Sequence, residues 1–342
     1  MGKQFAPIEI WSNPWDEKTE TAFSQKLLPS EKAGGGLFIG RLGGSDFEAV
    51  SQSYSRLKHF ASVPFAVVGK VLGLSNRAPY SSPFTRQHVE RVRNLNGYFD
   101  TKDDPQTYAF YLQAMHQAYL ETKCFTYGGK NLIDAVDRNE TRHPFHDYLS
   151  TVSKDKTLIS YAFIESVEPF VRSMHTWAAG RKVLVVSPFS NSVTHQWERR
   201  DNLLTRVNFP DFHLSTYQTP ITYSTLHNFR ERPLTARTDD WREEARVIIE
   251  EVLAMDFDIA LISCASYSMP LGAAIAKSNR RAVYLGGVLN PMFNILGARY
   301  KLVMESGLVN PRTTIHPLED AQFRDMTAGR KFKNEALRAY LP

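Results

Sequence analysis

One short stretch of the sequence, residues 41–48, combines an arginine, two glycines and two acidic residues. It reads RLGGSDFE and follows an apolar run at 37–40 that is typical of a buried strand. A strand, a glycine turn and a helix start often bind phosphate, because backbone N–H groups and the positive end of the helix dipole face the ligand. Arg41 can pair with a phosphate, and Asp46 and Glu48 can bind a divalent metal ion.

The same stretch also has a purely structural interpretation. Ser45 and Glu48 have the S-x-x-E spacing of a capping box, in which both side chains bond to backbone N–H groups at a helix start. Asp46, in the first turn, would complement the helix dipole. The G-x-G-x-x-G fingerprint of dinucleotide-binding proteins is missing here. This stretch alone therefore leaves both a ligand site and a helix cap open.

Three other predicted strands also end in polar or glycine-rich residues. Hydroxyl groups and small residues after a strand let an anionic ligand approach the backbone closely. The structural alternative is that Ser190 or Ser192 caps a helix, and that Cys264 is a small buried residue rather than a nucleophile. The residues in question are Pro188, Ser190 and Ser192 after 183–187, Ser263 and Tyr267 after 259–262, and Gly286, Gly287 and Asn290 after 282–285.

The composition is that of a globular protein with a mildly basic charge. The 342 residues include 41 lysines and arginines against 36 acidic residues, a formal net charge of +5. This favours an anionic partner such as a nucleotide, but the positive charge is not massed in blocks as in a nucleic-acid-binding arm. Two cysteines without metal-ligand spacing, and no apolar run of membrane-spanning length or signal peptide, lead us to expect a cytoplasmic protein.

The second half of the chain alternates between short apolar strands and amphipathic helices. This pattern predicts an α/β fold with a Rossmann-like, mainly parallel sheet and helices on both faces. In such sheets ligands bind beyond the carboxyl ends of the strands, so the four polar strand ends are expected to form one crevice. We expect one domain over 1–342, with a mostly helical insertion at 59–163 that serves the acceptor side, and a C-terminal extension at 301–342.

These segments, taken in order, resemble the GT-D-type glycosyltransferases. The family's R-x-G-x-x-E motif compares with Arg41–Asp46, and its VLVVxPF motif compares with 183–189. Gly44 stands where metal-dependent members have the first aspartate of D-x-E, and Asp46 stands for the glutamate. Further positions that match, or that differ only in residue type, are Ser192, Gln196, Arg199 or Arg200, 257–262, Tyr267, Gly286, Gly287, Asn290, Phe293, Gly297, Arg299 and Tyr300.

The resemblance implies a glycosyltransferase that uses a nucleotide-sugar donor, in the first place a UDP-sugar, and a glycan acceptor. We assign catalysis to Asp46 and Arg41, where the family match falls. Asp46 and Glu48, which form a literal D-x-E two residues after the family position, are the candidates for binding Mn²⁺ or Mg²⁺. Alternatives are a non-catalytic nucleotide- or glycan-binding protein of the same fold, and a glycosyltransferase that acts on modified nucleic acid. The residues expected to bind the donor are Gly43, Gly44, Ser45, Pro188, Ser190, Ser192, Arg199, Ser263, Tyr267, Gly286, Gly287, Asn290 and Arg299.

Overall fold

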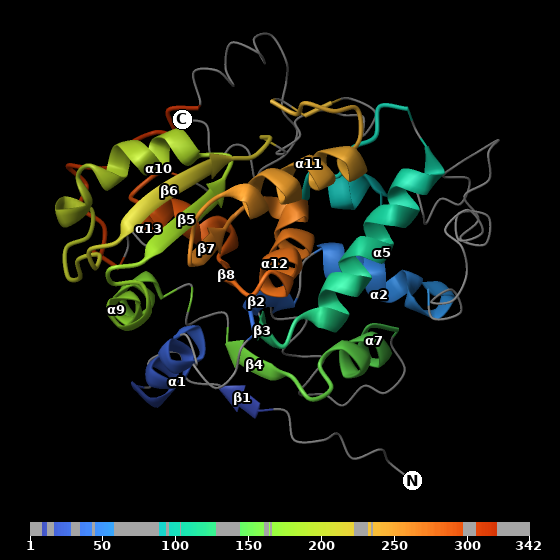
Figure 1. Cartoon of the computed structure of the whole chain (residues 1–342), viewed down its shortest axis with the longest axis horizontal. Helices are drawn as coiled ribbons and strands as arrows, with labels where there is room; N and C mark the ends of the chain where they lie inside the picture. The colour runs from blue at the N-terminus through green and yellow to red at the C-terminus, as the bar shows by residue number, and fades with distance from the viewer. Residues whose placement is uncertain are drawn as a thin grey trace.

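The protein is described by a computed structural model whose central element is an eight-stranded sheet (Figure 1). The strand order is β1-β4-β3-β2-β8-β7-β5-β6, and every neighbouring pair runs parallel. The predicted α/β fold with a parallel sheet is therefore confirmed. The residues described are 9–11, 17–28, 35–42, 45–57, 89–93, 96–102, 104–127, 144–160, 164, 166–221, 232–233, 235–296 and 306–319.

The strands are short and mostly apolar, as expected where helices cover both faces of a sheet. In β5, for example, residues 183–187 are all buried. Its side chains alternate between the faces, with Leu184 and Val186 in one hydrophobic core and Val183 and Val185 in the other. The strands are β1 (Glu9–Trp11), β2 (Leu37–Leu42), β3 (Cys124–Tyr127), β4 (Thr157–Ser160), β5 (Lys182–Ser187), β6 (His213–Gln218), β7 (Ile259–Ile262) and β8 (Arg281–Tyr284).

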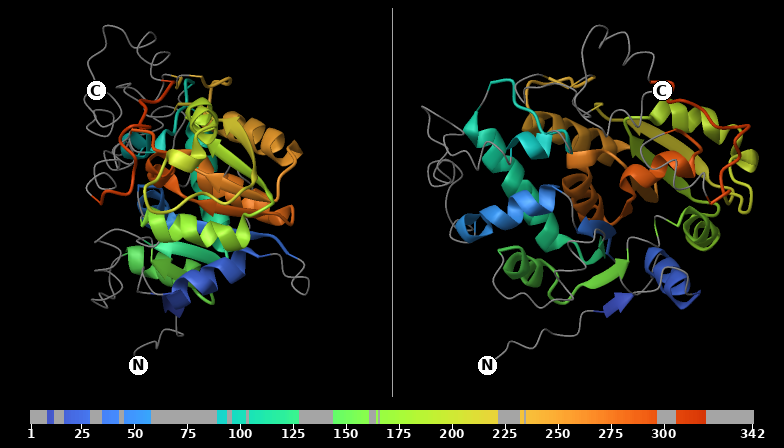
Figure 2. Two further views of the ribbon diagram at one scale, coloured as in Figure 1. Left: turned by 90° about the vertical axis from the view of Figure 1, so that its left-hand side faces the viewer. Right: turned by 180° about the vertical axis from the view of Figure 1, so that it is seen from behind.

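Each hydrophobic core is closed by its own set of helices (Figures 1 and 2). The first set is α2 (Ser45–Leu57), α5 (Pro105–Glu121), α7 (Pro144–Val152), α11 (Trp241–Ala254) and α12 (Ser268–Lys277). The second set is α1 (Glu17–Leu27), α9 (Val167–Trp177), α10 (Ser190–Trp197) and α13 (Leu289–Met292). Short 3-10 turns are η1 (Arg200–Asn202), η2 (Ala265–Tyr267) and η3 (Gly286–Val288).

Local capping chemistry explains where two of the helices begin. Asp240 accepts a hydrogen bond from the Glu243 N–H at 2.9 Å, so α11 starts at an aspartate cap. Asp104 caps α5 in the same way, and Pro105 occupies the first helical position, where no N–H is needed.

The region 59–163 contributes to the sheet as well as to its helical cover. Its described residues include α5 and α7, and also β3 and β4, which pair with each other and lie beside β2. The region therefore supplies two strands of the sheet in addition to helices. An aromatic stripe on α5 belongs to the core, with Tyr108, Tyr111 and Tyr119 at most 3% exposed.

One close contact fixes the distance between α12 and the sheet. A Cβ atom placed on Gly272 would lie 2.2 Å from the Phe38 ring of β2, well inside van der Waals contact. The helix can therefore approach the strand this closely only because residue 272 has no side chain. Among the described residues, none of the helices combines the length and the apolar character that a bilayer crossing requires.

Candidate functional site at the carboxyl edge of the sheet

The topology brings the four predicted strand ends together. Strands β2, β8, β7 and β5 are consecutive neighbours, so their carboxyl ends lie along about 14 Å of one sheet edge. The chain leaves β5 through α10 on one face and β7 through α12 on the other face. Such a change of direction between neighbouring strands opens a crevice, and this is where open α/β sheets bind ligands. The predicted proximity of the Arg41 and Gly286 turns is thus confirmed.

Asp46 is the centre of a buried polar cluster at the end of β2. It lies in the first turn of α2, is 5% exposed, and accepts a hydrogen bond from the Tyr111 hydroxyl of α5. Burial raises the pKa of Asp46 above its ordinary value, while hydrogen bonds with Tyr111 and Asn96 and the charge of Arg41 oppose that rise. The carboxylate is thus held by several groups at once, which fixes its position.

Arg41, on β2, acts electrostatically on more than Asp46. Its half-buried guanidinium opposes the rise that burial causes in the pKa of Tyr119 and Tyr284. Tyr284 is the last residue of β8, the strand next to β2. An arginine, an aspartate and several tyrosines therefore meet where two strands end. Positive charge at that place suits an anionic ligand group such as a diphosphate.

Glu48 does not share a site with Asp46. Both oxygens of its carboxylate bond to the Arg91 guanidinium at 3.0 Å, and the Arg91 side chain is 52% exposed. Asp46 instead bonds to Tyr111 inside the core. Within the described parts of the chain, no group of three His, Cys, Asp or Glu residues could hold a metal ion. The two carboxylates expected to bind Mn²⁺ or Mg²⁺ thus bond to different partners, and this pair does not fit a shared metal.

The turn after β7 is tied to the turn after β8. The Ser263 hydroxyl donates to the Gly286 carbonyl oxygen at 2.8 Å, and Gly286 has φ 59°, which glycine adopts without strain. Ala265 has φ 52°, a conformation that costs a non-glycine residue about 1–3 kcal/mol. Burial raises the pKa of the Cys264 thiol to about 12, so this cysteine is the inert buried residue expected rather than a nucleophile.

Tyr267 and Asn290 carry buried polar atoms that the described residues leave without a hydrogen bond. These atoms are the Tyr267 hydroxyl and Asn290 Nδ2, on side chains only 1% and 2% exposed. Tyr267 stacks on the Trp241 ring at 5.8 Å, and Asn290 lies at the start of α13. Buried polar groups normally have partners, and both residues come just after carboxyl ends of strands. They are therefore suitable contacts for a ligand or a bound water.

The start of α10 is already occupied by an acidic side chain. Ser190 and Ser192 are buried, but the N–H groups of Asn191 and Ser192 donate to the Glu319 carboxylate at 2.9 and 3.2 Å. The Ser192 hydroxyl donates to the same carboxylate. Pro188 is buried in the turn that leads from β5 into this helix. The position expected to bind a diphosphate is thus filled by a residue from the C-terminal part of the chain.

Two residues of the resembling motif lie away from this edge. Arg199 is exposed beyond the far end of α10, where its backbone accepts a hydrogen bond from the Asn202 N–H. Gln196 is buried and donates to the carbonyl oxygens of Asn294 and Thr313, at 3.1 and 2.9 Å, which is a structural role. Gly43, Gly44, Arg299 and the side chain of Ser45 lie outside the described residues.

Two residues that matter here, Tyr111 and Glu319, belong to none of the predicted sites. Tyr111 belongs to an aromatic stripe whose spacing indicated only core packing, and Glu319 lies in no recognisable motif. Both act through contacts with residues far away in the sequence. A polar hydroxyl within an otherwise apolar stripe was the available signal for Tyr111, because a buried tyrosine hydroxyl usually needs a partner.

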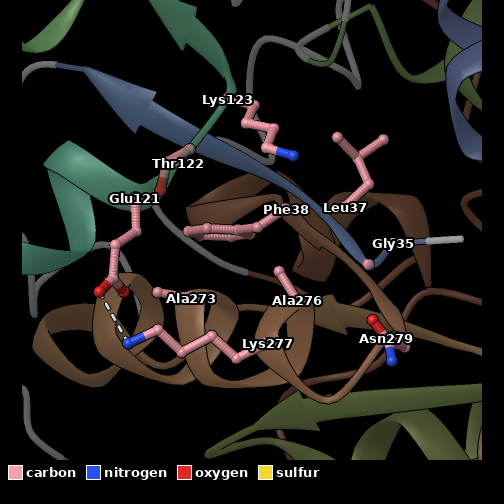
Figure 3. Close-up of a pocket in the computed structure, with 11 residues that line it drawn as sticks. Gly35, Leu37, Phe38, Glu121, Thr122, Lys123, Ala273, Ala276, Lys277 and Asn279 are labelled. Carbon is pink, nitrogen blue, oxygen red and sulfur yellow. Dashed lines mark ion pairs between the residues drawn. The ribbon is translucent and has the colours of Figure 1, made fainter. Parts of the chain in front are cut away.

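A pocket of about 260 Å³ lies at the opposite, amino edge of the sheet (Figure 3). It is bordered by the first residues of β2 and by the C-terminal ends of α5 and α12. Its charged residues include Glu121 and Lys277, which pair with each other at 2.7 Å. None of the predicted site residues lines it. The candidate functional site is therefore the carboxyl edge, where the buried Asp46 cluster and the unsatisfied Tyr267 and Asn290 atoms lie.

Comparisons with known proteins add no family to this picture. No protein-family model matches the chain, and no curated protein or solved structure is significantly similar to it. The resemblance to GT-D-type glycosyltransferases therefore rests on the sequence motifs alone.

Proposed function

We propose that the protein is a glycosyltransferase that moves a sugar from a nucleotide-sugar donor, in the first place a UDP-sugar, to a hydroxyl of a glycan acceptor. One observation carries this proposal. Three motifs that are far apart in sequence lie at the carboxyl ends of the consecutive strands β2, β8, β7 and β5. Two of their residues, Tyr267 and Asn290, have buried polar atoms without a hydrogen bond among the described residues at this carboxyl edge. A crevice at this edge is the usual ligand site of an open parallel sheet.

The roles of the residues follow from their exposure and charge. Arg41 is half-buried and positively charged, so it is suited to stabilise the negative charge that develops on a departing diphosphate. Asp46 is more deeply buried and is held by Tyr111. We therefore assign Asp46 to positioning, through its charge on Arg41, rather than to direct contact with substrate. Tyr267 and Asn290 would contact the donor through the hydroxyl and the amide.

A thermal-shift panel of nucleotide sugars, each with and without Mn²⁺, tests the proposal. A donor at 100 times its Kd should stabilise the protein by roughly 2.7 kcal/mol, which is easily detected. Donors that raise the Tm are then incubated with glycan acceptors while release of the nucleoside diphosphate is measured. If no nucleotide sugar stabilises the protein, the proposal is wrong.

The same panel separates the alternatives. A nucleotide sugar that stabilises the protein, but is neither hydrolysed nor transferred, would indicate a non-catalytic binding protein of this fold. Transfer to hydroxymethylated oligonucleotides, but not to glycans, would indicate a nucleic-acid acceptor. The chain's net charge of +5 permits that acceptor but does not favour it.

A further inference from the structure

Residues 306–319, here called the strap, run along α10 and α13 and end at the start of α10 (Figure 2, red segment). Gln196 Nε2 donates to the Thr313 carbonyl oxygen at 2.9 Å, and Asn294 Nδ2 donates to the Asn310 carbonyl oxygen at 2.7 Å. Ile315 forms a parallel bridge with Ile295. The strap is thus anchored upstream by contacts that do not involve its terminal residue, Glu319.

Glu319 is a buried carboxylate whose hydrogen-bond donors, among the described residues, all come from one helix start. It is 3% exposed, and it accepts hydrogen bonds from two N–H groups of α10 and from the Ser192 hydroxyl. No lysine or arginine among the described residues pairs with it. Burying a carboxylate is costly unless it is compensated, and in the described part of the chain the start of α10 supplies that compensation.

A second observation indicates that this place is built for more than a helix cap. Gln196 of α10 bonds to the Asn294 carbonyl oxygen at 3.1 Å. Ser192 lies one helical turn before Gln196 in α10, and Asn290 belongs to α13, which follows β8 on the same face of the sheet as α10. Asn290 Nδ2 is buried there without a hydrogen-bond partner among the described residues. An anionic ligand that extends from the start of α10 to the start of α13 would supply an acceptor for that amide.

We propose that Glu319 is an internal occupant of an anion site, and that the diphosphate of a ligand must displace it to bind. The strap would then close the β5 end of the crevice in the absence of ligand and open when a phosphate replaces the carboxylate. No covalent bond changes in this exchange. The choice of a nucleoside diphosphate as ligand rests on the proposed function, whereas the displacement itself needs only a phosphate anion.

The test compares wild type with Glu319→Gln, using inorganic pyrophosphate and UDP as probes in calorimetric titrations at one ionic strength. Removing the competing charge should tighten the binding of both probes by about tenfold or more, the size expected for one charge-assisted contact. Glu250→Gln is the matched control. It removes the same charge from an exposed residue of α11 that bonds to Arg246, and it should leave both affinities unchanged.

A second measurement on the unaltered protein keeps the test informative if Glu319→Gln does not fold. Saturating pyrophosphate should increase amide hydrogen exchange in 306–319, because the displaced strap loses its terminal anchor. Unchanged or weaker binding in a folded Glu319→Gln protein, or no change in strap exchange with pyrophosphate bound, would overturn the displacement proposal. Pyrophosphate that displaces the strap in a protein that accepts no nucleotide sugar would leave this inference intact and refute only the proposed function.

Discussion

The Tyr111 hydroxyl of α5 donates a hydrogen bond to Oδ1 of Asp46 in the first turn of α2, across 65 positions of sequence. Both side chains are buried, and Tyr111 also packs edge-to-face on Trp241 with ring centroids 4.9 Å apart. The aromatic core is thus bonded directly to the acid of the candidate site. A change in that core should therefore be felt at the site.

Tyr111→Phe removes only the hydroxyl and should destabilise the protein by about 1–3 kcal/mol, because a buried carboxylate loses a donor. Urea unfolding measures this loss. In a double-mutant cycle with Asp46→Asn, the two losses should not add, since both changes remove part of one interaction. Additive losses would show that the two side chains do not stabilise each other.

Arg41→Ala should weaken binding of the nucleotide ligand by about 1.5–3 kcal/mol, the usual cost of losing a charge-assisted contact to phosphate. The free energy of unfolding should fall by less than the binding energy does. Titration calorimetry and urea unfolding measure the two quantities. Arg91→Ala is the control, because Arg91 is another arginine near α2 but pairs with Glu48 at the surface. Equal ligand affinities in Arg41→Ala and wild type would leave Arg41 with a structural role only.

Glu48→Gln should be nearly silent. The Glu48–Arg91 pair is partly exposed, and such pairs contribute about 0.2–1 kcal/mol. Melting temperature and turnover should therefore stay close to wild type, and Mn²⁺ titrations should be the same for both proteins. A variant that needs much more Mn²⁺ for activity would restore Glu48 as a metal ligand.

Asp100 should make the protein less stable as pH rises. Burial, aided by Asp240 and Asp104, raises the pKa of Asp100 to about 6 from 3.8. The folded state therefore binds more protons at Asp100 than the unfolded state between these values, so the contribution of Asp100 to stability is greatest below pH 3.8 and is lost as pH rises from 3.8 through 6. At about 1.4 kcal/mol per pKa unit, the full loss is about 3 kcal/mol.

Asp100→Asn cannot ionise and should keep the acceptor for the Lys102 N–H. Its stability relative to wild type should rise by up to about 3 kcal/mol between pH 4 and pH 8 in urea unfolding. Asp239→Asn is the control, since Asp239 is half-exposed and pairs with Lys102 at 3.5 Å. A difference between Asp100→Asn and wild type that does not change with pH would contradict the assignment.

The sheet could be predicted from the sequence because its signals are local. Short apolar runs are typical of strands that are covered by helices on both faces, and the sequence has such runs near 183–187, 259–262 and 282–285. The cap of α11 is local too, because Asp240 bonds to the N–H of a residue only three positions later. The partners of Asp46 and Ser192 could not be predicted in this way. Tyr111 and Glu319 are brought to them by tertiary packing, and periodicity carries no information about which distant side chain bonds to which.

The contact between Gly272 and Phe38 has a consequence for how this scaffold can vary. At Gly272 the backbone of α12 itself contacts the Phe38 ring. No side chain at this position can be made shorter or longer, so the distance between α12 and β2 cannot be adjusted by substitution there. The η2 turn with Tyr267 leads directly into α12, and Arg41 belongs to β2. The distance between Tyr267 and Arg41 is therefore set by this helix–strand contact. Adaptation to a larger or smaller ligand is left to the loops at the rim.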